Sequence, residues 1–265
     1  MSKPFVFDQP HATRYVDARQ GFLRELLPEF KEALGLRTAL DVGCGIGYFS
    51  GFLREMGFRV VAFDGRPENI EEARRRNPGV DFRVADAEDP KVQELGSFDL
   101  VLCFGLLYHL ENPLRAFRNL RALTGKLLLV ESTSVPEEAP VLYLRDEPHL
   151  EDQGLNALGC YPSEGGLIKM AYRAGFSAVY RFTRCPDHEE FRDGLGRKRS
   201  RTVLAASPGP LSSPVLVVAP EPTTVSDLWS TDRTGVTRMF QRLGRFLRRP
   251  WPEKLAAVRR RYGPG

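Results

Sequence analysis

The sequence predicts an α/β fold with a mostly parallel sheet and helices on both of its faces. Short apolar segments alternate with helical patterns from about residue 37 to about residue 207, which is typical of βαβ units. Near the start of this region, an apolar strand with an acid at its end runs directly into a glycine-rich loop and a helix. A hydrophobic fraction of 42% over 265 residues can supply the core of one large domain with extensions.

Seven segments are predicted to be strands, and the last two should form an antiparallel pair. They are the stretch ending at Asp41, then 58–63, 81–85, 97–104, 126–130, 176–182 and 201–206. Helices are expected over 15–34, directly after Gly47, over 113–123 and over 163–175, where Ser163 is a candidate N-cap. The first of these helices should pack on the edge of the sheet, despite Pro28 within it.

The most informative segment is 40–49, Leu-Asp-Val-Gly-Cys-Gly-Ile-Gly-Tyr-Phe. Its three glycines follow G-x-G-x-G, and a loop without Cβ atoms lets a ligand approach main-chain N–H groups. The nicotinamide fingerprint would need its third glycine where Tyr48 stands. Asp41 places a negative charge beside the loop, which suits a cationic ligand better than a pyrophosphate. The loop therefore predicts a site for S-adenosylmethionine.

Asp-x-Gly-x-Gly-x-Gly resembles the first motif of class I S-adenosylmethionine-dependent methyltransferases, and the later elements follow in that family's order. Asp64 ends the second strand 23 residues after Asp41, near the spacing at which βαβ units present an acid to ribose hydroxyls. The resemblance implies that Asp86 and Ala87 meet the adenine, and that segment 105–113 passes the methyl end of the cofactor. It implies a Rossmann-like class I methyltransferase fold with a seven-stranded sheet, to which the sequence adds a basic C-terminal extension.

The predicted cofactor-binding residues lie at the carboxyl ends of the first four strands. They are Asp41, Gly43, Cys44, Gly45, Gly47, Asp64, Gly65, Asp86, Ala87, Phe104 and Gly105. No metal ion is predicted, because neither the polar stretch 145–152 nor 185–188 has the spacing of a metal site.

Methyl transfer from a sulfonium is an in-line displacement that needs no covalent nucleophile, so alignment of donor and acceptor can supply much of the rate. His109 is the candidate general base, because the resemblance places it at the cleft and its titration range suits that role. The alternative is that His109 caps a helix or shapes the adenosine pocket. Tyr108 is predicted to orient the substrate or cofactor, with simple packing as its alternative.

The chain divides into four segments by composition. Residues 1–36 are predicted to form a helical lid over the methionine end of the cofactor, and residues 37–207 are predicted to form the methyltransferase domain. Segment 134–163 within it is too long for an ordinary connection, which predicts a substrate loop or lid. Residues 208–225 are a Pro/Ser-rich linker in which 215–219 could pair locally, and 226–265 form a basic amphipathic tail.

The tail carries ten basic residues and three acids, so the rest of the chain is slightly acidic. Such a tail could bind nucleic acid, an anionic membrane surface or an acidic protein, or it could pack on its own domain. Residues 1–10 lack the basic and apolar sections of a secretory signal, and no apolar run reaches the length of a membrane span. A cytoplasmic location is the prediction.

Three functions are compatible with these patterns. The first is methylation of an oxygen or nitrogen of a small organic acceptor. The alternative is a tRNA wobble-uridine methyl- or carboxymethyltransferase, because 105–113, 162–163, 174–176 and 197–199 also resemble that group. Against RNA, the acids Glu147, Glu151 and Asp152 of the lid would repel a polyanion. The third is a non-catalytic module that binds the cofactor or a partner.

Overall fold

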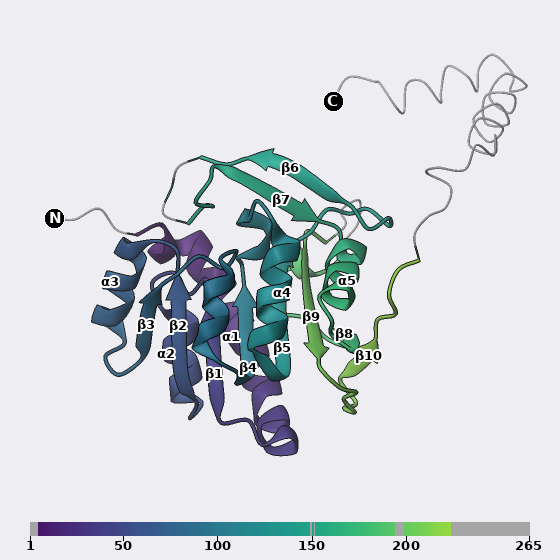
Figure 1. The fold of residues 1–265 in the computed structure, drawn as a ribbon, viewed down its shortest axis with the longest axis horizontal. Helices are drawn as coiled ribbons and strands as arrows, with labels where there is room; N and C mark the ends of the chain where they lie inside the picture. Colours follow the sequence, from purple (N-terminus) through teal and green to yellow (C-terminus); the bar gives the residue numbers. More distant parts are fainter. Residues whose placement is uncertain (1–4, 149, 151, 194–198, 224–265) are drawn as a thin grey trace, which may run out of the picture. The chain divides into compact units, whose positions relative to one another are not determined.

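A computed structural model describes residues 5–148, 150, 152–193 and 199–223, and its main feature is an eight-stranded sheet covered on both faces by helices (Figure 1). The strand order is β10-β8-β9-β5-β4-β1-β2-β3. The strands are β1 (Thr38–Val42), β2 (Arg59–Asp64), β3 (Asp81–Val84), β4 (Phe98–Phe104), β5 (Thr124–Thr133), β8 (Ala178–Phe182), β9 (Arg201–Ser207) and β10 (Leu216–Val218).

The strands β3, β2, β1, β4 and β5 run parallel, whereas β9, β8 and β10 are joined to β5 and to one another by antiparallel pairing. The carboxyl ends of the five parallel strands therefore meet at one edge of the sheet. This edge is where open α/β sheets bind ligands.

Two hydrophobic layers hold helices against the sheet. The helices are α1 (Pro10–Leu34), α2 (Tyr48–Glu55), α3 (Pro67–Arg76), α4 (Pro113–Leu123) and α5 (Glu164–Arg173). Leu40 and Val42 of β1 face α4 and α5, whereas Ala39 faces α1 and α2, because successive side chains of a strand point to opposite faces. The helix α3 packs with Ala62 and Phe82.

The helix at the N-terminus packs differently from the sequence expectation. Its apolar residues Phe22, Leu26 and Phe30 join the core beside Leu100 and Leu127 of the central strands. The prediction that this helix covers the edge of the sheet is therefore wrong, since α1 lies on a face. Pro28 lies inside the helix without ending it, and Gly35 closes the helix in the left-handed conformation.

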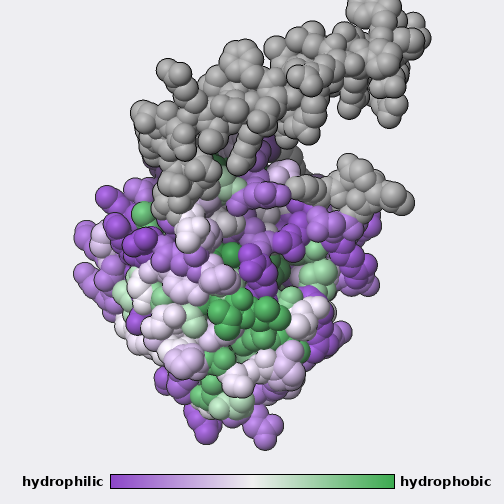
Figure 2. Space-filling model, turned by 90° about the vertical axis from the view of Figure 1, so that its right-hand side faces the viewer, coloured by the Kyte–Doolittle hydropathy of each residue, from purple (hydrophilic) through white to green (hydrophobic). Residues whose placement is uncertain are grey.

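The sheet has eight strands rather than the seven expected, because β10 pairs antiparallel with β8. The segment expected as a linker thus contributes to the domain as far as the described residues reach, and it buries Val215 and Ala219. Val217 and Val218 of this edge strand are exposed, and a hydrophobic area is visible on this side of the molecule (Figure 2). The basic tail 226–265 lies outside the described residues.

The expected lid contains a two-stranded hairpin of β6 (Leu142–Asp146) and β7 (Leu158–Pro162), which the sequence did not predict. All five residues of β6 are exposed, so the strand has no buried face and no alternating pattern. The 3-10 turns η1 (Val6–Asp8), η2 (Pro90–Leu95), η3 (Leu107–His109) and η4 (Glu189–Phe191) complete the described elements. Among the helices of these residues, none has the length and apolar character that crossing a membrane requires.

Candidate functional site

The glycine loop after β1 is tied to the end of β2. The amides of Gly43 and Cys44 both donate to the Phe63 carbonyl, at 2.9 and 3.0 Å. Gly45 has a φ of 51°, a left-handed value that favours glycine, and its amide donates to Asp64 Oδ2 at 2.9 Å. The two strand ends therefore form one rigid floor at the edge of the sheet.

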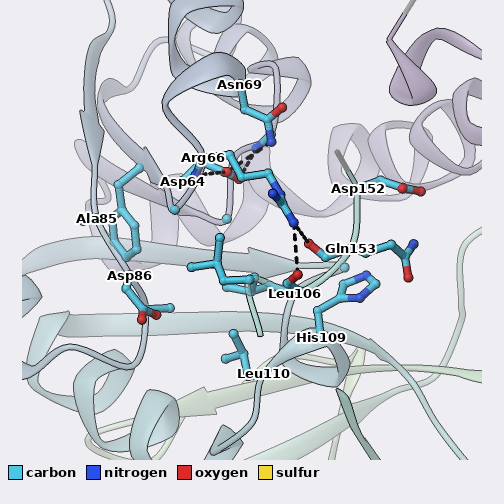
Figure 3. Close-up of a pocket in the computed structure, with 18 of the residues that line it drawn as sticks. Asp64, Arg66, Asn69, Ala85, Asp86, Leu106, His109, Leu110, Asp152 and Gln153 are labelled. Carbon is cyan, nitrogen blue, oxygen red and sulfur yellow. Dashed lines mark hydrogen bonds between the residues drawn. The ribbon is translucent and has the colours of Figure 1, made fainter. Parts of the chain in front are cut away.

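Asp64 is the most highly coordinated acid of this floor. Its Oδ1 accepts hydrogen bonds from the Arg66 amide at 3.0 Å and from Asn69 Nδ2 at 3.1 Å (Figure 3). Its side chain therefore has one fixed orientation toward the cavity that it lines.

Among three neighbouring acids after β3, only Asp86 lines this cavity. Glu88 accepts hydrogen bonds from the amides of Glu111 and Asn112, and Asp89 caps η2 by accepting from the Lys91 amide. The structure thus places Asp86, the acid that the sequence favoured, at the cavity, and it gives its two neighbours other partners.

A narrow cavity of about 80 Å³ lies over the floor. Seven of the predicted cofactor-binding residues line it: Gly43, Gly45, Asp64, Gly65, Asp86, Ala87 and Gly105. Sequence reasoning missed Arg66, Asn69, Leu106, Leu110 and the lid residues 152–155. Arg66 and Asn69 follow Asp64 within five residues, so their closeness to a predicted acid could have identified them. No neighbouring motif in the sequence identifies the lid residues.

The structure does not bring Asp41 or Gly47 to the lining of this cavity or of its neighbour. The carboxyl of Asp41 is buried below the loop, where burial raises its pKa to about 7 although the Ser50 hydroxyl donates to it at 2.6 Å. Gly47 begins α2, and a Cβ there would lie 2.7 Å from Asn77 Nδ2. Both residues shape the loop from beneath.

A second cavity of about 530 Å³ adjoins the first. The predicted residues Cys44, Phe104 and Tyr108 line it, and four predicted residues line both cavities: Gly43, Gly45, Gly105 and His109. Its walls are strongly aromatic, with Phe7, Tyr15, Phe49, Tyr108 and Tyr161. The two cavities thus meet at the glycine loop and at His109.

A buried ionic network supports one wall of the second cavity. Glu131, fully buried at the end of β5, contacts Arg19 Nη2 at 3.1 Å and Arg201 Nη1 at 2.9 Å. Arg201 also pairs with Glu190 at 2.9 Å, and the Tyr15 hydroxyl donates to Glu190 at 2.5 Å. Burial and then this hydrogen bond raise the pKa of Tyr15 to about 12. Sequence reasoning missed the network because its members come from four distant segments.

His109 is held by a carboxylate from the lid. Its Nδ1 lies 2.9 Å from both oxygens of Glu147, whose side chain is only 1% exposed. The Gly154 amide donates to Glu147 Oε2 at 2.8 Å and the Tyr161 hydroxyl to Oε1 at 3.3 Å. Burial raises the pKa of Glu147, but the hydrogen bonds from His109 and Gly154 outweigh it and the net pKa is lowered. The expectation that Glu147 repels a polyanion at the lid is therefore wrong, because its carboxylate is buried and hydrogen-bonded.

The lid is also attached to the floor of the narrow cavity. Arg66 Nη2 donates to the carbonyls of Gln153 at 3.2 Å and Gly154 at 3.0 Å (Figure 3). The side chain of Leu155 lies where a Cβ on Gly65 would be, only 2.6 Å from it. Lid residues thus close both cavities from above.

No group of three or more His, Cys, Asp or Glu side chains within the described ranges could hold a metal ion. All four cysteines are free thiols, and Cys44, Cys103 and Cys160 are buried. Burial raises the pKa of the Cys103 thiol above its ordinary value, so this side chain is a poor nucleophile.

Comparison with protein families gives a match of residues 40–126 to a family described as "Methyltransferase domain". The Ubiquinone biosynthesis O-methyltransferase of Xanthomonas axonopodis pv. citri (strain 306) is 35% identical over 141 residues, which cover 51% of this chain and 54% of that protein. The same enzyme of Xanthomonas oryzae pv. oryzae (strain PXO99A) is 38% identical over 104 residues, which cover 37% of this chain and 44% of that protein. The chain therefore spans about half the length of the curated relatives it matches.

Solved structures share the fold at lower identity. The N-terminal domain of EvdMO1 with SAH bound has a TM-score of 0.56 and 22% identity, over 71% of this chain and 80% of that one. An S-adenosylmethionine-dependent methyltransferase from Mesorhizobium loti has a TM-score of 0.52 and 21% identity, over 72% of this chain and 99% of that one. At these identities the likeness is one of fold.

Proposed function

We propose that this protein transfers a methyl group from S-adenosylmethionine to a hydroxyl of a small aromatic acceptor, and the match of residues 40–126 to the family described as "Methyltransferase domain" supports this proposal. One observation carries the proposal. The narrow cavity over Asp64 and the larger aromatic cavity meet at Gly43, Gly45, Gly105 and His109. Two ligands can therefore meet where the loop and His109 lie.

The residues of the narrow cavity fit an adenosine. Asp64 and Asp86 offer carboxylate oxygens to hydroxyl and amine donors, and Ala87, Leu106 and Leu110 supply apolar walls. The volume of about 80 Å³ is below the roughly 300 Å³ at which ligand pockets begin, so one wall has to give way on binding. Leu155, which is 43% exposed and packs over Gly65, is the side chain that can rotate outward.

The larger cavity fits a flat acceptor. Aromatic side chains from η1, α1, α2, η3 and β7 supply its walls, and rings prefer to pack against rings. Arg145 also lines this cavity and lies 5.1 Å above the Tyr161 ring, and no carboxylate among the described residues forms an ion pair with it. The cavity therefore suits an aromatic compound that is neutral or carries a negative charge.

His109 is the proposed general base. When bound, the cofactor supplies an electrophilic methyl group on a sulfonium, and the acceptor hydroxyl must lose its proton as it attacks. His109 lines both cavities, and with Nδ1 held by Glu147 its Nε2 is the nitrogen free to take that proton. Tyr108, whose ring lies 4.0 Å from that of His109, is proposed to orient the acceptor.

The relatives named above are O-methyltransferases, which is why we choose oxygen over nitrogen as the atom methylated. The tRNA alternative gains no support from the described residues, and its argument from the basic tail lies outside them. The free thiols suit a reducing compartment, so a cytoplasmic location is part of the proposal.

The test is calorimetric titration with S-adenosylmethionine followed by a screen of hydroxylated aromatic acceptors with a methyl-labelled cofactor. Saturable binding is expected, and Asp64→Ala should weaken it roughly 10- to 100-fold, because each hydrogen bond to a charged group is worth about 1.5–3 kcal/mol. Asp81→Ala is the matched control, since this exposed acid at the start of β3 lines neither cavity.

Two results would contradict the proposal. Equal weakening by Asp64→Ala and Asp81→Ala would remove the cofactor site from the narrow cavity. Tight cofactor binding without transfer to any phenol, catechol or hydroxybenzoate would favour the non-catalytic module instead.

A further inference from the structure

We propose that Glu147 is a positioning residue for His109: the lid carboxylate fixes the imidazole as the Nδ1–H tautomer and so makes Nε2 the basic nitrogen that faces the acceptor. The role in turnover rests on the proposed function, whereas the tautomer is a property of the protein alone. Glu147 and His109 are 38 residues apart, and their contact exists only because the lid folds over η3.

The direction of the hydrogen bond follows from the charge of Glu147. Because the hydrogen bonds to this carboxyl lower its pKa, it is ionised near neutral pH and can only accept. The proton between the two side chains must therefore be on Nδ1 of His109. A neutral imidazole carries one proton, so Nε2 is left as an acceptor.

The site around Glu147 is built to hold a carboxylate in one place. Two further donors, the Gly154 amide and the Tyr161 hydroxyl, occupy its oxygens in addition to His109. Glycines stand where the lid approaches most closely: a Cβ on Gly159 would lie 2.5 Å from the Tyr108 carbonyl oxygen and 2.9 Å from Glu147 Oε1. A Cβ on Gly154 would overlap the His109 carbonyl oxygen and lie 3.1 Å from Glu147 Oε2.

A buried carboxylate in this position also supports the charge that appears during the reaction. As the new O–CH₃ bond forms and the S–CH₃ bond of the cofactor breaks, the acceptor proton moves to Nε2 and His109 becomes an imidazolium. Glu147 then forms a buried ion pair with it, and such pairing favours the charged form. The lid thus supplies the carboxylate that orients the base, and His109 has this partner only when the lid packs over η3.

The experiment combines NMR and kinetics on the full chain. The four histidines are few enough for each imidazole to be assigned by ¹⁵N labelling and single-residue substitution. In the wild type above pH 7, His109 should show a protonated Nδ1 and an unprotonated Nε2. Glu147→Gln keeps the shape but can donate as well as accept a hydrogen bond, so the proton of His109 should no longer be confined to Nδ1.

In turnover, Glu147→Gln should reduce kcat at least 10-fold, since a general base contributes roughly 10²–10⁴-fold, and should move the acidic limb of the pH–kcat profile to lower pH. The KM for the acceptor should change less than twofold. The control is Glu111→Gln, because this exposed acid also contacts the lid through Asn156, at 3.0 Å, but does not contact His109. The control should keep the profile of the wild type.

Several outcomes would overturn the inference. One is an Nε2–H tautomer for His109 in the wild type, a measurement that also decides the matter if Glu147→Gln does not fold. Another is a Glu147→Gln variant whose His109 tautomer and pH–kcat profile stay as in the wild type even if kcat falls, because a fall in kcat alone reports a loss of lid packing. If no acceptor is methylated by the wild type, the proposed function fails, while the tautomer measurement still supports or refutes the role of Glu147.

Discussion

Replacing Asp41 by Asn should change how the stability of the protein depends on pH. The Asp41 carboxyl is 2% exposed beneath the glycine loop, and burial raises its pKa from 3.8 to about 7. A raised carboxyl pKa means that the fold prefers the neutral form. Its contribution to stability is therefore fully present below pH 3.8, is lost progressively as pH rises, and is gone once pH exceeds about 7.

The magnitude follows from the size of the shift. The pKa rises by about three pH units, and each unit corresponds to 1.36 kcal/mol, so ionising Asp41 in the fold costs about 4 kcal/mol. Asn has the same shape, can accept the hydrogen bond of Ser50 and never ionises. The free energy of unfolding of Asp41→Asn, relative to the wild type, should therefore increase by about 4 kcal/mol between pH 4 and pH 8.

Urea unfolding of both proteins at half-unit pH steps measures this difference. Asp99→Asn is the control, because partial burial raises the pKa of Asp99 but the amides of Arg37 and Thr38 outweigh it and hold the pKa at about 2. The stabilising contribution of the Asp99 carboxylate is present above pH 3.8 and is lost as pH falls toward 2. The difference in free energy of unfolding between Asp99→Asn and the wild type should therefore be constant from pH 5 to 8. A difference for Asp41→Asn that varies by less than 1 kcal/mol over the range would refute the reasoning.

Two further substitutions test the packing that supports the site. Gly21→Ala should raise the free energy of unfolding by roughly 0.5–1 kcal/mol, since Gly21 lies inside α1 and an added Cβ would meet nothing within 4 Å apart from its chain neighbours and the backbone of its own helix. Thermal unfolding that shows a loss of stability would contradict the described packing. Arg201→Gln should destabilise by about 3–5 kcal/mol, because Glu131 then keeps a buried charge with Arg19 as its one remaining cationic partner among the described residues. The double variant Glu131→Gln/Arg201→Gln should recover part of that loss in the same unfolding measurement, and a double variant as unstable as the single one would show that the charge is not the cause.

The sequence by itself determined the parallel sheet, the glycine loop and the acids at the strand ends. These features are local: apolar strands, turn glycines and an acid at the end of a strand lie within a few residues of one another. Asp64 and Asp86 could be predicted to converge because parallel strands end at the same edge of a sheet. Asp41 and Gly47 belong to the same sequence pattern, but they lie under the loop and line neither of the two cavities.

The tertiary structure alone decided what surrounds the reacting centre. Glu147 carries no local signal that distinguishes it from other lid acids, and β6 has no buried face from which its strand could be predicted. Likewise Arg19, Glu131 and Arg201 lie on three elements far apart in the chain. Periodicity reports only whether a side chain faces a core, whereas the choice of partner for a buried charge depends on which segments pack together. Nearby residues in the sequence are thus enough to predict where a strand ends. By contrast, Glu147, which contacts the proposed base, and Arg19 and Arg201, which support the cavity wall, reach their partners only when the lid, α1 and β9 pack together.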